Sequence, residues 1–137
     1  MKQSPLLKFE SSAFAVIPGE DEQTNPGIYG KTLAEWLGEQ LRLAGVAAEK
    51  VIAEDFGWCV SVKAPPYSLY VACANEAAGH WKVFAFVEGG LMDRILRKDK
   101  SAELLAPLYA TVRRCLESSS AVHGLREESL DCYSGSK

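Results

Sequence analysis

The chain has 137 residues, of which 47% are hydrophobic and 24% charged, a composition typical of one ordinary globular domain. Its net charge of -3 argues against non-specific binding to nucleic acid or to an anionic membrane. No run approaches the roughly 18 apolar residues that span a bilayer, and the first residues do not have the pattern of a secretory signal. We therefore expect a cytoplasmic protein that binds neither membranes nor nucleic acid.

The four cysteines lie far apart in the sequence and include no CxxC pair: they are Cys59, Cys73, Cys115 and Cys132. This spacing fits reduced, buried thiols better than a disulfide framework or a zinc site. We expect no metal and no cofactor.

The first strong pattern is an apolar segment over 8–17, which we interpret as a strand that ends at Pro18-Gly19. A helix is predicted over 30–44, because apolar residues recur there at a helical period with charges on the opposite side. Gly45 is its expected C-terminal stop.

Four strands are expected next, over 51–53, 58–63, 68–74 and 80–88. The alternation of the second and third of these strands fixes how they pair, because a slip of one residue would turn an apolar set to the wrong face. The predicted pairs are Val62 with Leu69, Val60 with Val71, and Trp58 with Cys73.

A basic segment over 91–100 is expected to form a short helix or a loop, and a second long helix is expected from Ser101, with Pro107 near its start or kinking it. Residues 121–137 are polar and are predicted to form a loose tail, with at most one short element at 125–130. The predicted domain is therefore 1–120.

The expected order is β-α-β-β-β-β-α, which lacks the strand and helix alternation of a doubly wound fold. This order predicts the α+β class, with a mostly antiparallel sheet and both helices on one face. The other face would be open or partly covered by the tail.

Carboxylates concentrate in predicted loops, before the first helix and after the second strand, and Glu76 and Glu88 lie at later strand ends. In an antiparallel sheet some of these carboxylates could converge on one edge. Loops carry charge because they are solvated, so a plain surface role is one interpretation. The other is an acidic patch that meets a basic protein. The residues predicted to contact such a partner are Glu20, Asp21, Glu22, Tyr29, Glu54, Asp55, Phe56 and Trp58. Their spacing matches no EF-hand, which makes a metal site the weakest alternative.

No catalytic motif surrounds His80 or His123, and no GxSxG or phosphate-binding glycine loop is present.

Phe84 and Phe86 cannot share a strand face with Trp81, because the side-chain period is two. An exposed Phe84 and Phe86 pair on an open sheet face would be a protein-binding patch.

Three motifs carry a resemblance: Pro18-Gly19-x-Asp21-x-x-Thr24-Asn25-Pro26-Gly27-x-Tyr29-Gly30, Leu33-Ala34-x-Trp36-Leu37 and Glu54-Asp55-Phe56-Gly57-Trp58. Over 9–90 the chain resembles a group of small uncharacterised bacterial α+β proteins, whose relatives include proteins that look like immunity partners of secreted toxins. The resemblance brings no catalytic residues. It implies a bacterial accessory or binding protein.

Three hypotheses follow. The first is a non-enzymatic protein-binding domain, an immunity protein that neutralises a basic toxin by binding it. The second is a small ligand-binding or hydrolytic enzyme with a site near 18–29 and 54–58. The third is an accessory protein that resembles a secretion chaperone and uses the open sheet face. The sequence leaves the oligomeric state open.

Overall fold

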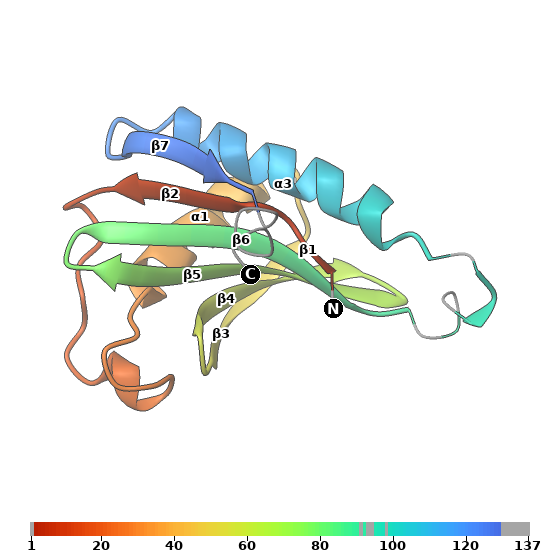
Figure 1. The fold of residues 1–137 in the computed structure, drawn as a ribbon, viewed down its shortest axis with the longest axis horizontal. Coiled ribbons are helices and arrows are strands. Elements are labelled where there is room, and N and C mark those ends of the chain that lie inside the picture. The colour runs from red at the N-terminus through yellow and green to blue at the C-terminus, as the bar shows by residue number, and fades with distance from the viewer. Residues whose placement is uncertain (1, 91, 93–94, 98, 130–137) are drawn as a thin grey trace.

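The computed structural model describes residues 2–90, 92, 95–97 and 99–129. The fold is α+β, as predicted, with two long helices and one seven-stranded sheet (Figure 1). The elements in chain order are β1 (Lys2–Gln3), β2 (Leu6–Glu10), the short 3-10 helix η1 (Glu20–Glu22), α1 (Lys31–Leu43), β3 (Ala48–Glu54), β4 (Gly57–Ala64), β5 (Tyr67–Ala77), β6 (His80–Gly89), α3 (Ser101–Glu117) and β7 (His123–Glu128).

The strands lie in the order β3-β4-β5-β6-β2-β7, and β1 pairs with β6. Every pairing is antiparallel. The predicted register of the β4–β5 hairpin is confirmed: Val62 lies opposite Leu69, Val60 opposite Val71 and Trp58 opposite Cys73. Alternating patterns and a short loop were sufficient to fix this register.

Helices α1 and α3 pack together on one face of the sheet, as expected, and their apolar stripes meet the inward residues of the strands. Leu33, Leu37 and Leu41 of α1 are buried there with Leu108 and Leu116 of α3. Pro107 lies inside α3, past its first turn, where it removes one hydrogen bond from the helix backbone. We call this side of the sheet the covered face.

The opposite side, the open face, has a smaller apolar cluster. Cys59, Ala72 and Phe86 are buried at its centre. Ile52, Tyr70 and Phe84 pack around them and remain partly exposed. None of these six residues comes from a helix.

The strand predicted over 8–17 is wrong in its second half, since β2 ends at Glu10. After Ser11 the chain leaves the sheet, and Phe14 folds back against the rings of Phe9, Trp36 and Trp81. One aromatic side chain anchors this loop, whereas Val16 and Ile17 are exposed. The apolar run at 13–17 therefore belongs to a loop that is held by Phe14, and it is not part of a strand.

The tail predicted over 121–137 allowed one short element at 125–130, and the structure has strand β7 at His123–Glu128. Strand β7 pairs with β2 and forms an edge of the sheet. Polar contacts hold it, because Arg126 pairs with Glu10 at 2.7 Å and the Tyr109 hydroxyl of α3 donates to Glu127 at 2.6 Å. Residues 130–137 lie outside the described residues.

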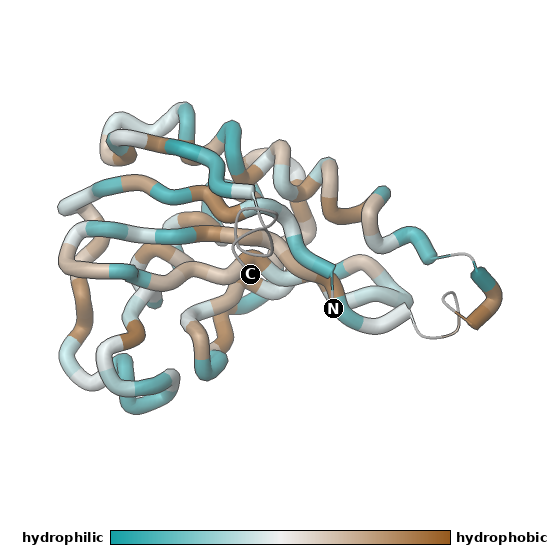
Figure 2. The backbone as a smooth tube through the Cα atoms, viewed as in Figure 1, coloured by the Kyte–Doolittle hydropathy of each residue, from teal (hydrophilic) through white to brown (hydrophobic). Residues whose placement is uncertain are grey.

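The described residues between β6 and α3 lie away from the sheet (Figure 1). Of these, Met92, Ile95 and Leu96 are exposed, and Figure 2 shows an apolar stretch at their tip. Across the described residues, no helix is long and apolar enough to cross a membrane.

Candidate functional site

The loop before α1 and the turn of the β3–β4 hairpin are held together at one end of the sheet. The Asn25 side-chain amide donates to the backbone oxygen of Asp55 at 3.0 Å. The loop is also joined to β5, because Tyr29 N–H donates to Asn75 Oδ1 at 2.9 Å and Asn75 N–H donates to the Tyr29 oxygen at 3.1 Å. Two motifs that are separate in sequence therefore form one surface.

Two glycines fix the backbone of this surface. Gly30 and Gly57 have φ values of 153° and 154°, which side chains rarely adopt. A Cβ on Gly30 would lie 2.4 Å from the carbonyl oxygen of Cys73, and one on Gly57 would lie 2.6 Å from the same atom. The loop and the hairpin therefore pack against one carbonyl, and only glycine allows the approach.

Glu20 was predicted to contact a partner, and the structure corrects this. The side chain is only 4% exposed. Its Oε1 accepts hydrogen bonds from the N–H groups of Gly30 (2.9 Å) and Lys31 (3.0 Å), and its Oε2 accepts one from Ile17 N–H (2.8 Å). A carboxylate at a helix N-terminus is favoured by the helix dipole. Glu20 therefore caps α1 and closes the loop.

Asp21 and Tyr29 contact each other beside this cap. Asp21 Oδ2 accepts a hydrogen bond from Gly27 N–H at 2.9 Å. The negative charge of Asp21 raises the pKa of the Tyr29 phenol above its ordinary value. Both side chains are half-buried, whereas Glu22 points into solvent. Of the three loop carboxylates, Glu22 is the most available to a partner.

Trp58, another predicted contact residue, belongs to the core instead. It is 3% exposed and lies on the covered face. The Lys31 ammonium lies 5.2 Å from its ring centre, a cation–π arrangement at the start of α1. Among the described residues, its indole nitrogen is the one buried side-chain nitrogen or oxygen without a hydrogen-bond partner.

The hairpin turn carries the remaining predicted residues, and all three are exposed. Glu54, Asp55 and Phe56 face solvent, with Phe56 41% exposed. The Phe56 ring leans over the open face, where it lies 6.2 Å from the Phe84 ring and 5.8 Å from the Phe86 ring. We call Glu22, Glu54, Asp55 and Phe56 the acidic edge.

Three further residues adjoin the acidic edge and were not in the predicted site. Tyr70, Phe86 and Glu88 line a small cavity together with Glu54 and Phe56. The signal for them was the period-two pattern of β5 and β6, which places Tyr70 and Phe86 on the open face. No sequence pattern shows that Glu54 reaches the same place.

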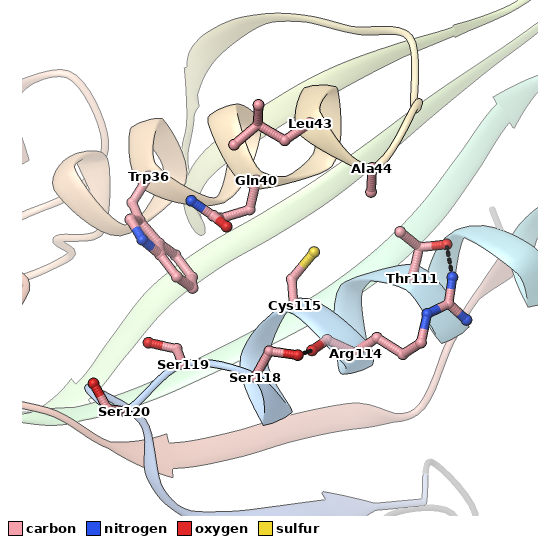
Figure 3. Close-up of a pocket in the computed structure, with 10 residues that line it drawn as sticks. All are labelled: Trp36, Gln40, Leu43, Ala44, Thr111, Arg114, Cys115, Ser118, Ser119 and Ser120. Carbon is pink, nitrogen blue, oxygen red and sulfur yellow. Dashed lines mark hydrogen bonds between the residues drawn. The ribbon is translucent and has the colours of Figure 1, made fainter.

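A larger cleft, of about 590 Å³, lies between the C-terminal halves of α1 and α3 (Figure 3). It contains no predicted site residue. Much of its polar surface is engaged locally, because Arg114 donates to Thr111 and Ser118 donates to the Arg114 carbonyl oxygen. The Cys115 side chain points into the cleft between the helices, and burial raises the pKa of its thiol.

The described residues contain no group of three or more His, Cys, Asp or Glu that could hold a metal ion. His80 lies at the start of β6 with Nδ1 3.8 Å from Glu10 Oε2. His123 is opposite Glu10 in the β2–β7 pairing. Both histidines are exposed and lie beside the same surface carboxylate, that of Glu10.

Comparison with known proteins found no match for this chain among family models, curated proteins or solved structures.

Proposed function

We propose that this chain is a non-enzymatic protein-binding domain of the bacterial cytoplasm, an immunity protein that neutralises a basic toxin by binding it. The contact surface is the acidic edge. One observation carries the proposal: the Asn25 to Asp55 hydrogen bond of 3.0 Å joins two loops whose outward side chains are carboxylates and an exposed phenylalanine.

Electrostatics support this assignment. Glu22, Glu54 and Asp55 take part in none of the ion pairs of the described residues, so their charges are available to a partner. Complementary charge speeds encounter and fixes register. Phe56 supplies an aromatic anchor of the kind that dominates protein interfaces.

The anchored backbone also supports binding. The loop is closed by Glu20 and the turn is held by Asn25, so little conformational entropy is lost when a partner docks. An exposed loop without these contacts would bind less tightly through the same side chains.

The test begins with the proteins encoded beside the gene for this chain. Each is purified and mixed with it, and one basic neighbour is expected to form a tight one-to-one complex and to lose its toxicity when both are co-expressed. The absence of any such neighbour, or catalytic turnover by this chain of a compound supplied to it, contradicts the proposal.

A triple variant, Glu22→Gln, Glu54→Gln and Asp55→Asn, locates the contact surface. It is expected to slow association at least about tenfold at low salt and to flatten the salt dependence, with an unchanged melting temperature. The matched control removes three charges from the helices: Glu35→Gln, Glu39→Gln and Glu103→Gln. Equal effects of the two triple variants would show that net charge matters and the acidic edge does not.

A further inference from the structure

The open face has a small, partly enclosed cavity of about 60 Å³, where β5 and β6 pass beneath the β3–β4 turn. It is lined by three aromatic residues, Phe56, Tyr70 and Phe86, and by two acidic residues, Glu54 and Glu88. No residue of the covered face takes part. The cavity therefore combines aromatic surface with negative charge.

The aromatic walls are fixed by the sheet itself. Tyr70 and Phe86 are directly opposite each other on β5 and β6, and their rings stack with centres 5.0 Å apart and planes 21° apart. Phe56 meets Phe86 edge-on, with an angle of 69° between the rings. A site on paired strands keeps its shape better than one on a free loop.

The two carboxylates approach the cavity from different strands. Glu54 ends β3, whereas Glu88 lies near the end of β6 opposite Ser68. Both act on the buried Cys59 thiol beneath: burial, and to a smaller extent the charges of Glu54 and Glu88, together raise the pKa of Cys59 to about 12. The two negative charges therefore converge on one small region.

These carboxylates have no cationic partner within the described part of the chain. Four glutamates elsewhere in the sheet do: Glu10 pairs with Arg126, Glu127 with Arg113, and Glu76 and Glu128 share Lys8. Two like charges beside one apolar cavity repel each other and are stabilised when a cation enters between them.

We propose that this cavity binds the guanidinium group of one arginine side chain from the protein partner. Aromatic faces attract cations, and guanidinium stacks on rings while its N–H groups reach two carboxylates. A cavity of about 60 Å³ is in keeping with a single planar head group. The inference rests on the proposed function, since it names the group on the basic partner that the acidic edge receives.

The direct test needs no partner. N-acetyl-arginine amide is titrated into the labelled protein and followed by NMR. We expect saturable shifts of Gly57 and Ala72 amides and of the Tyr70 and Phe86 ring protons. The N-acetyl-lysine amide is expected to bind at least threefold more weakly, and the uncharged citrulline analogue is expected to cause no such shifts.

Variants define the site. Glu54→Gln with Glu88→Gln is expected to weaken arginine amide binding at least tenfold without changing the melting temperature, since both carboxylates are exposed. The matched control, Glu35→Gln with Glu103→Gln, is expected to bind as the unmodified protein does. Shifts that are absent, that map elsewhere, or that survive in the Glu54 and Glu88 double variant overturn the inference.

The outcomes separate this inference from the proposed function. Arginine amide binding at the cavity, with no neighbouring protein bound, supports the site and removes the immunity function. A tight complex with a neighbour that the Glu54 and Glu88 double variant leaves unchanged supports the function and overturns the arginine site.

Discussion

The two faces of the sheet bury their side chains by different means. On the covered face Val60, Val71 and Val83 are fully buried because two helices lie over them. On the open face Cys59 and Ala72 are equally inaccessible, yet aromatic side chains from the same sheet and its turn cover them. Burial on the covered face therefore serves stability, whereas the rings of the open face can be contacted by another molecule.

The largest expected effect compares two adjacent residues of β4. Val60→Asp places a charge beneath the helices and is expected to cost at least about 4 kcal/mol of the free energy of unfolding. Ser61→Asp lies on the open face, where the Ser61 hydroxyl exchanges hydrogen bonds of 3.2 Å with the Lys50 backbone, and is expected to cost about 1 kcal/mol. Urea unfolding measures both. Similar losses would show that the open face is as covered as the other.

A second comparison lies within the loop before α1, between an inward and an outward carboxylate. Glu20→Ala removes the acceptor of three backbone N–H groups and is expected to cost about 3 kcal/mol. Glu22→Ala is its control and is expected to stay within about 0.5 kcal/mol. Thermal unfolding measures the two losses. A stable Glu20→Ala protein would mean that the loop does not depend on this cap.

The smallest structural perturbation is chemical labelling of the thiols. At pH 8 in the native protein, the half-buried Cys115 is expected to react first. Cys59 should follow, because only side chains of the open face cover it, and Cys73 beneath the helices should react last. Mass spectrometry gives the order. After denaturation four free thiols are expected, including Cys132, which lies outside the described residues.

The same thiols make stability depend on alkaline pH. The pKa of Cys59 is raised from 9.0 to about 12 in the folded chain, so above pH 9 the unfolded chain loses a proton that the folded chain keeps. The free energy of unfolding should therefore be unaffected below pH 9 and fall as pH rises from 9 to 12. The Cys59→Ala variant is expected to show a shallower fall. An unchanged slope in Cys59→Ala would assign the effect to other groups.

The sequence predicted the parts of the fold that local patterns govern. The α+β class, both helices and the β4–β5 register follow from periodicity and turn residues. Strand β7 does not follow from periodicity, because polar residues occupy both of its faces and no alternation marks it. Its place depends on contacts with Lys8, Glu10 and Tyr109, far away in sequence.

The candidate site, too, was predicted only in part. The motifs around Asn25 and Asp55 correctly marked the two segments that meet. The burial of the Glu20 side chain was missed, since it depends on an irregular loop conformation that no helical or strand periodicity predicts. Glu54 and Glu88 were expected only as two of several carboxylates that could converge on one edge of the sheet, and no sequence pattern showed that they line the same aromatic cavity.

The meeting of Gly30 and Gly57 at the Cys73 carbonyl has a consequence for how such a chain can diversify. The backbone is held by glycines and by main-chain atoms, including the carbonyl of Asp55, so the side chains at 22, 55 and 56 carry none of that scaffolding. Descendants of this gene can exchange those side chains for others without rebuilding the loops. Single substitutions at these positions therefore change the exposed surface and leave the architecture intact.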